Sequence, residues 1–329
     1  MLWIEKYRPG DFSGIVGQDR AIAFLSSVVG QQTIPHLLLT GPGGSGRMST
    51  VRCLAAALYG EHADENTTVI ATGDLFNEGR AYLQGDARFS HLYRKDESLI
   101  ANVKRIIKTY AAIRPFDTGF KLMVFQEADA MPGELQQALR RTMERYSRTC
   151  RFIMITSRQS AILPSIASRC FPVVFRPVPT GTVASLLREI LRTEGAEPIP
   201  DDDLAMIAAS ARGDVRRAIM MLELTVSSGA PPPFDAFEVS RAERGASGVL
   251  SRLREGDLAG AQRLAQSLMI EDGLTGRDLL IELRRAVWRG DADPELAIAI
   301  AETDSRFAQG AGESVQIGAL LAQVPEVCR

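Results

Sequence analysis

The stretch TGPGGSGRMST, residues 40–50, has the frame of a phosphate-binding loop, G-x-x-x-x-G, between Gly41 and Gly46. A buried-strand pattern, HLLLTG (36–41), leads into this loop, and a helical pattern leads out of it from Arg47. That context directs backbone N–H groups and a helix N-terminus at phosphate. Such loops normally end in Lys and then Ser or Thr, because the ammonium reaches the β- and γ-phosphates and the hydroxyl holds Mg²⁺. Arg47 and Met48 stand at these positions, so the stretch predicts a phosphate cradle with altered catalytic groups.

The flanking sequence predicts an α/β module, in which a parallel sheet is covered by helices. Three further apolar runs indicate strands: VIAT (69–72), KLMVFQEAD (121–129) and RFIMITS (151–157). From about Phe175 the strand patterns stop, and helical patterns follow at 182–193, 202–211 and 215–227. The proline-rich stretch GAPPPF (229–234) then precedes a helical remainder. We therefore expect an α/β domain over 1–174, a small helical domain over 175–230 and an all-helical domain over 235–329.

Bulk properties exclude several classes of protein. The formal net charge is −2, so any nucleic-acid contact must come from a local basic patch. The four cysteines form no CxxC pair and there are three histidines, so no metal site is predicted. No apolar run of about 18 residues occurs, and the N-terminus lacks the apolar core of a signal peptide. We expect a soluble intracellular protein.

Eight motifs together resemble the small subunits of replication factor C, the clamp-loader branch of the AAA+ ATPases. They are WIEKYRP (3–9), VGQ (16–18), the glycine loop (40–50), EADAM (127–131), QQALRRTME (136–144), SRC (168–170), GDVRRAI (213–219) and LMIEDGLTGRDLL (268–280). The resemblance runs from end to end with matched spacing. It implies a AAA+ module, a helical lid and a C-terminal collar that joins subunits. Residues 75–97 depart from the family pattern.

The resemblance implies ATP or ADP as the ligand. The implied nucleotide-binding residues are Tyr7, Arg8, Val16, Gly17, Gly41, Pro42, Gly43, Gly44, Ser45, Gly46, Arg47, Met48, Ser49 and Arg216, the last as the sensor-2 arginine of the lid. Relatives that hydrolyse ATP have Lys and Thr where this chain has Arg47 and Met48, Asp in place of Gln126, and a sensor-1 Asn in place of Ser157. Losing the two magnesium contacts, at Met48 and Gln126, leaves the metal held mainly by phosphate and water. We therefore expect ATP or ADP to bind at this site, with weak affinity if binding depends on the magnesium contacts. We do not expect this site to hydrolyse ATP.

Two further residues have catalytic roles in relatives. By resemblance, Arg169 of the SRC motif is an arginine finger, which points at the γ-phosphate bound by a neighbouring subunit. Glu127 matches the residue that orients the attacking water. With the other groups altered, it is interpreted as a remnant or as a structural hydrogen-bonding acid.

A basic helix over 98–112 matches the family's DNA-tracking helix, which makes the candidate phosphate contacts Lys104, Arg105 and Lys108. A solvated helix face is the alternative. The following tip matches a sliding-clamp contact, with Tyr110, Ile113 and Phe116 as candidates; core packing of Tyr110 and Phe116 is the alternative. The divergent 75–97 block adds Arg80, Arg88, Arg94 and Lys95, so it either extends the DNA contact or forms a mobile surface loop.

The leading hypothesis is a catalytically degenerate clamp-loader subunit. It would assemble with other replication factor C subunits into a hetero-pentamer that uses ATP to load a sliding clamp onto primer–template DNA. Two alternatives remain: an active ATPase in which Arg47 replaces the lysine, and a AAA+-derived DNA-binding scaffold that assembles with itself. The resemblance implies a cytoplasmic location in an archaeon, or a nuclear one in a eukaryote.

Overall fold

A computed structural model describes residues 1–31, 33–114, 118–229, 241–271, 273–289, 294–308 and 312–327. The chain divides into two compact units, Met1–Pro231 and Pro232–Arg329. Within the described residues, no helix is both long enough and apolar enough to cross a bilayer.

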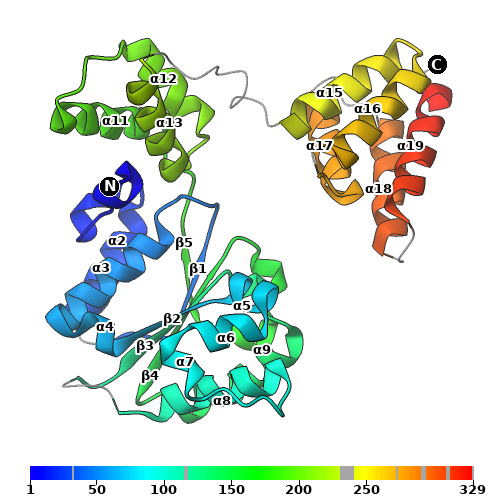
Figure 1. The fold of residues 1–329 in the computed structure, drawn as a ribbon. Coiled ribbons are helices and arrows are strands. Elements are labelled where there is room, and N and C mark those ends of the chain that lie inside the picture. The colour runs from blue at the N-terminus through cyan, green and yellow to red at the C-terminus, as the bar shows by residue number, and fades with distance from the viewer. Residues whose placement is uncertain are drawn as a thin grey trace. The chain divides into compact units, whose positions relative to one another are not determined.

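The first unit is built on a five-stranded parallel sheet with the strand order β2-β3-β4-β1-β5 (Figure 1). The strands are β1 (Leu37–Thr40), β2 (Thr67–Ala71), β3 (Lys121–Gln126), β4 (Cys150–Thr156) and β5 (Phe171–Val174). The α/β fold class and the four predicted strands are confirmed. The edge strand β5 was not predicted, because it contains Pro172 and only Val173 of its four residues is buried.

Helices cover both faces of the sheet (Figure 1). Alternation along β1 sends Leu37 and Leu39 into the core beneath α2 (Asp19–Gly30) and α3 (Arg47–Tyr59), whereas Leu38 faces the opposite core. That second core is closed by α8 (Leu99–Ala112) and α9 (Gly133–Arg145). Shorter helices complete the module: α1 (Trp3–Lys6), α4 (Ala63–Asn66) and α10 (Pro164–Ala167), with 3-10 turns at Phe12–Gly14, Gly60–His62, Ala128–Ala130 and Gln159–Ala161.

The divergent block is folded. It forms α5 (Thr72–Glu78), α6 (Arg80–Gly85) and α7 (Ala87–Ser90), and it buries Leu75, Leu83 and Phe89 in the same core as α8. The alternative of a mobile surface loop is therefore wrong for these helices, since each contributes a fully buried apolar side chain.

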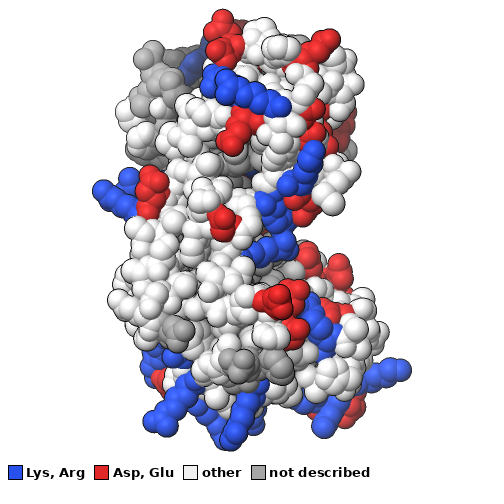
Figure 2. Space-filling model, turned by 90° about the vertical axis from the view of Figure 1, so that its left-hand side faces the viewer, with Lys and Arg blue, Asp and Glu red and all other residues white. Residues whose placement is uncertain are grey.

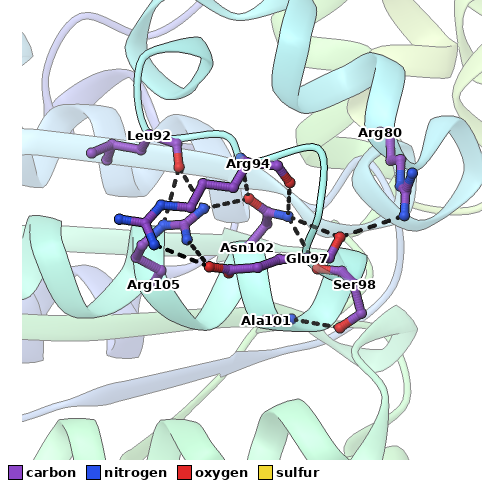
Figure 3. A network of polar contacts seen from close by, with 8 residues as sticks. All are labelled: Arg80, Leu92, Arg94, Glu97, Ser98, Ala101, Asn102 and Arg105. Atoms are coloured by element: carbon purple, nitrogen blue, oxygen red, sulfur yellow. Dashed lines mark hydrogen bonds and ion pairs between the residues drawn. The ribbon is translucent and has the colours of Figure 1, made fainter.

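A buried asparagine joins this block to α8. The side chain of Asn102 accepts a hydrogen bond from the backbone N–H of Arg94 (2.7 Å) and donates to the carbonyl of Arg94 (2.9 Å) and that of Ser98 (3.1 Å). Arg105, one turn along α8, donates four hydrogen bonds to the carbonyl of Leu92, the amide oxygen of Asn102 and the carboxylate of Glu97 (Figure 3). The segment between α7 and α8 is thus held by side chains of α8.

Three helices follow β5 within the first unit: α11 (Thr180–Glu194), α12 (Asp201–Ser210) and α13 (Val215–Ser228). They match the three helices predicted from the apolar pattern. The boundary that separates them from the α/β part as a domain of their own, at 174/175, stays a prediction.

The second unit consists, in its described residues, of helices joined by short loops. It comprises α15 (Arg241–Arg254), α16 (Leu258–Ile270), α17 (Gly276–Arg289), α18 (Pro294–Ala308) and α19 (Glu313–Val327), packed around a core of their own. The structure thus supports the prediction of a helical C-terminal region, which requires no contact with the sheet to bury its apolar side chains.

We predict that Asn102→Ala lowers the free energy of unfolding by about 1–3 kcal/mol, because buried backbone groups lose their partners. The change is measurable by urea denaturation followed by circular dichroism. Asn77→Ala, at an exposed position of α5, is the matched control. Equal stability of the two variants would show that the Asn102 network does not anchor the block.

Candidate functional site

The glycine loop connects β1 to α3 and shapes a concave backbone surface. Gly46 lies at φ 93° as the residue before α3, a left-handed conformation that favours glycine, and the N-terminus of the 13-residue helix therefore faces the loop. A helix N-terminus with free N–H groups attracts phosphate. The fit of the loop to a phosphate group thus depends on backbone atoms. These atoms are in place whether position 47 is Lys or Arg.

A cavity of about 420 Å³ opens beside the loop. Its lining joins the N-terminal segment, the loop, the ends of β3 and β4, and helices α11 and α13. All of the predicted nucleotide-binding residues line it except Gly17, Gly41 and Pro42. Gln126, Glu127 and Ser157 also line it. Arg52, one turn into α3, is a lining residue that the sequence reasoning missed, because no motif marks it.

The loop is tied to the helices that follow β5. Val215, at the start of α13, donates its N–H to the carbonyl of Gly44 (3.1 Å). Gly44 lies at φ 63°, and a Cβ there would come within 1.7 Å of the carboxylate of Asp214. Only glycine allows this approach, so the loop and the first turn of α13 form one surface.

Gln18 forms the second tie and was not singled out from the sequence, although its motif was. Its side chain is 4% exposed. The amide nitrogen donates to the carbonyls of Ser45 (3.3 Å) and Arg176 (2.7 Å), and the amide oxygen accepts from the N–H of Arg176 (3.1 Å). The same motif contains Gly17. A Cβ atom at this position would lie 2.9 Å from the side chain of Val178, so a larger residue would be crowded there.

The N-terminal motif closes the cavity from another side. The hydroxyl of Tyr7 donates to Glu194 of α11 (2.6 Å), which also pairs with Lys6, and the N–H of Trp3 donates to Glu223 of α13 (3.1 Å). Burial, together with the hydrogen bond and charge of Glu194, raises the pKa of Tyr7 to about 12, so this tyrosine remains a donor at neutral pH. Arg8 pairs with Glu5.

Arg47 extends across the floor of the cavity. Its Nη1 donates to the carbonyl of Thr156 at the end of β4 (2.5 Å). Burial lowers the pKa of the guanidinium, while the carboxylates of Asp129 and Glu127 oppose that shift. The group stays charged because an arginine does not lose its proton at physiological pH.

The acidic residues after β3 make contacts within the chain. Asp129 accepts hydrogen bonds from the hydroxyl of Thr156 (2.8 Å) and from Nε of Arg158 (3.1 Å). Burial disfavours its charged form, but these two bonds outweigh burial and hold the pKa of Asp129 below its usual range. Glu127 has positive φ (53°), and its carboxylate lies over Gly73, where a Cβ would be 2.0 Å from Oε2.

Arg169 lies just before β5 and is anchored within its own chain. Its Nε (2.9 Å) and Nη2 (2.5 Å) both donate to one carboxylate oxygen of Glu144 in α9, and its Nη1 donates to the carbonyl of Ser165 (2.7 Å). Arg140 approaches the same Glu144 oxygen at 3.5 Å. These cations hold the pKa of Glu144 below its usual range, with the hydrogen bond from Arg169 as the largest cause.

The predicted DNA-contact residues differ in their surroundings. Lys104 pairs with Glu134 of α9 (2.6 Å). Lys108 is exposed, and no ion pair is found for it in the described part of the chain. Arg105 is turned into the network of Figure 3. On the face shown in Figure 2, basic side chains are interspersed with acidic ones and form no single continuous field.

The predicted clamp contacts also differ in their surroundings. Tyr110 packs edge-to-face on Phe89, with ring centroids 5.7 Å apart, and donates its hydroxyl to the carbonyl of Arg88 (2.6 Å). Ile113 is 51% exposed. Phe116 lies outside the described residues. The core-packing alternative for Tyr110 thus has direct contacts in its support.

A glycine-rich phosphate loop between β1 and α3, on a five-stranded parallel sheet covered by helices, defines a AAA+ module. Residues 17–179 match the family model "DNA polymerase III, delta subunit", and residues 247–323 match "Replication factor C C-terminal domain". The replication factor C small subunit of Thermoplasma volcanium is 33% identical, covering 99% of this chain and 98% of that protein. Those of Archaeoglobus fulgidus (32%; 100% and 98%) and Methanoregula boonei (34%; 98% and 95%) are similarly close. The chain belongs to the replication factor C small subunit family.

Among solved structures, a mutant of RuvB from Thermotoga maritima aligns with a TM-score of 0.50 at 14% identity, over 84% of this chain and 85% of that one. This likeness supports the AAA+ fold alone.

We predict that Gln18→Ala lowers the free energy of unfolding by about 1–3 kcal/mol, because the backbone groups of Ser45 and Arg176 lose a buried partner. Thermal and urea unfolding measure the loss. Gln137→Ala, exposed on α9, is the control. A midpoint for Gln18→Ala that equals the control would mean that the loop does not depend on this tie.

Proposed function

We propose that this chain is a catalytically inactive small subunit of a clamp loader that uses ATP to load a sliding clamp onto primer–template DNA. It occupies one position in a hetero-pentamer, and it supplies Arg169 to the ATP site of a neighbouring subunit. The observation that carries this proposal is that Met48, Gln126 and Ser157 stand where the family pattern has metal and sensor groups, while the SRC motif keeps Arg169, anchored to Glu144 and Ser165.

Magnesium, which P-loop ATPases hold through a Ser or Thr and an Asp, does not fit the side chains of this site. The thioether of Met48 packs against the core beneath α2 and α3, and a thioether is a poor ligand for a hard cation. Gln126 offers a neutral amide in place of the carboxylate. Asp129 already accepts from Thr156 and Arg158. The backbone cradle does fit a phosphate group, so nucleotide binding and hydrolysis are separable here.

The geometry of Arg169 supports a role in trans. A guanidinium has five N–H donors, and each of the three nitrogens of this one donates one bond, to Glu144 or Ser165. Two donors remain, and the side chain is 30% exposed. An arginine that is held by three bonds and keeps two donors loses little conformational freedom when it meets a phosphate.

Glu127 acts as a structural remnant under this proposal. Its positive φ is a strain of the kind that persists at functional sites, and its carboxylate lies against Gly73 at the edge of the cavity that it lines. Under this proposal it orients no attacking water, because the other groups of the catalytic centre are altered.

Lys104 and Lys108 of α8 contact DNA phosphates under this proposal, and the lid over 175–230 and the collar over 235–329 serve nucleotide closure and assembly. Arg105 braces the α5–α7 block instead, because it makes four hydrogen bonds within the chain. Ile113 is the exposed apolar residue nearest the end of α8 and is the remaining described candidate for the clamp.

We predict that Arg169→Ala, in the complex assembled with its partner subunits, slows hydrolysis at the neighbouring site by about 10³-fold or more. The complex then loses that site's share of ATP turnover and its clamp-loading activity. Arg192→Ala, an exposed arginine of α11, serves as the control. Unchanged turnover and loading by the Arg169 variant would refute the trans role.

We predict that Lys108→Ala weakens DNA binding by the complex and reduces the slope of log K against log salt by about 0.9, the release expected for one phosphate contact. Arg105→Ala should leave the slope unchanged and lower the unfolding midpoint. Fluorescence anisotropy over a salt series measures the first effect, and thermal unfolding the second. The assignment would be reversed if the Arg105 variant changed the slope and kept full stability.

A further inference from the structure

The cavity beside the glycine loop is strongly cationic. Its lining contains the four guanidinium groups of Arg8, Arg47, Arg52 and Arg216 and the single carboxylate of Glu127. Arg8 is compensated by Glu5 outside the lining, while the other three face a cavity with one acid. A polyphosphate is the ligand class that balances such a charge.

The guanidinium of Arg47 is held at the ends of the strands. One of its donors is bound to the carbonyl of Thr156, which fixes the guanidinium at the end of β4 beside Gln126 and Ser157. Four N–H donors remain on a planar, permanently charged group. A fixed cation therefore already occupies the region between the loop and the ends of the strands, where an ATPase of this class needs carboxylate and hydroxyl oxygens.

A divalent cation gains little from the two side chains at the metal-binding positions of the family. Met48 and Gln126 bring no charge, and the guanidinium of Arg47 in the same lining repels a dication, which leaves Glu127 as the single carboxylate of the lining. Binding magnesium also removes two negative charges from the nucleotide, and this weakens its attraction to the arginines.

We propose that this site binds adenine nucleotide without magnesium, with the Arg47 guanidinium supplying the positive charge that the metal supplies in active relatives. The inference rests on the proposed function, because it takes the site to be one that does not hydrolyse its ligand. It goes further in naming the bound species as the metal-free nucleotide and Arg47 as the group that replaces the metal.

The test is isothermal titration of the full chain with ADP and with ATP, each in EDTA and in excess Mg²⁺. The expected result is binding in EDTA that is at least as tight as in Mg²⁺, since the uncomplexed nucleotide carries the greater charge. Affinity at least about tenfold tighter in Mg²⁺, equivalent to about 1.4 kcal/mol, would overturn the proposal, and so would the absence of binding in EDTA.

A double variant gives a matched positive control. Met48→Thr with Gln126→Asp restores the two oxygen ligands and keeps Arg47, so its nucleotide affinity should rise on adding Mg²⁺ while that of the natural chain does not. Arg47→Ala should weaken binding in EDTA more than in Mg²⁺, and circular dichroism checks that it is folded. An Arg47→Ala variant that is folded and binds in EDTA as tightly as the natural chain would contradict the role given to this residue.

The same samples separate this inference from the proposed function. Magnesium-dependent binding with no phosphate release would overturn the inference and leave the inactive site in place. Magnesium-dependent binding with phosphate release by the chain alone would overturn both.

Discussion

One buried threonine links the parts of this site. Thr156, fully buried at the end of β4, accepts hydrogen bonds at its carbonyl from the N–H of Gly41 (3.3 Å) and from Arg47 (2.5 Å). Its hydroxyl donates to Asp129 (2.8 Å) and accepts from the N–H of Arg158 (3.0 Å). Since the carboxyl ends of parallel strands meet at one edge of a sheet, residues far apart in the chain converge here. A change at one of them alters the surroundings of the others.

This convergence explains how, under our proposal, the fold is kept while hydrolysis is lost. The phosphate cradle is made of backbone groups and a helix N-terminus, and Gln18 and Val215 hold it to neighbouring segments through backbone atoms of the loop. Hydrolysis, by contrast, depends on side chains at the strand ends, where the resemblance indicates that this chain departs from the family pattern. Under our proposal, the chain therefore contributes its fold, its subunit contacts and Arg169 to the assembly.

The sequence predicted most of the fold, because strands and helices have strong apolar periodicity and the glycine loop lies between β1 and α3. It did not predict β5, whose single buried residue and proline leave no strand pattern. Basic spacing on α8 suggested one role for Lys104, Arg105 and Lys108, but only the structure separates an arginine that binds Glu97 and Leu92 from an exposed lysine. Spacing carries no information on where a side chain finds its partners across the fold, and the same limit applies to Gln18 and to the Arg169–Glu144 pair.

The central claim is that the chain's own site does no chemistry in the assembled loader. ATP turnover by the complex carrying Glu127→Gln measures this most directly, because the substitution removes the acid at the position that orients water in active relatives and preserves the size of the side chain. Our account predicts turnover and clamp loading equal to those of the unchanged complex. In a working site, losing such a group costs about 10²–10⁴-fold in rate, so the disappearance of one site's share of turnover would contradict the account.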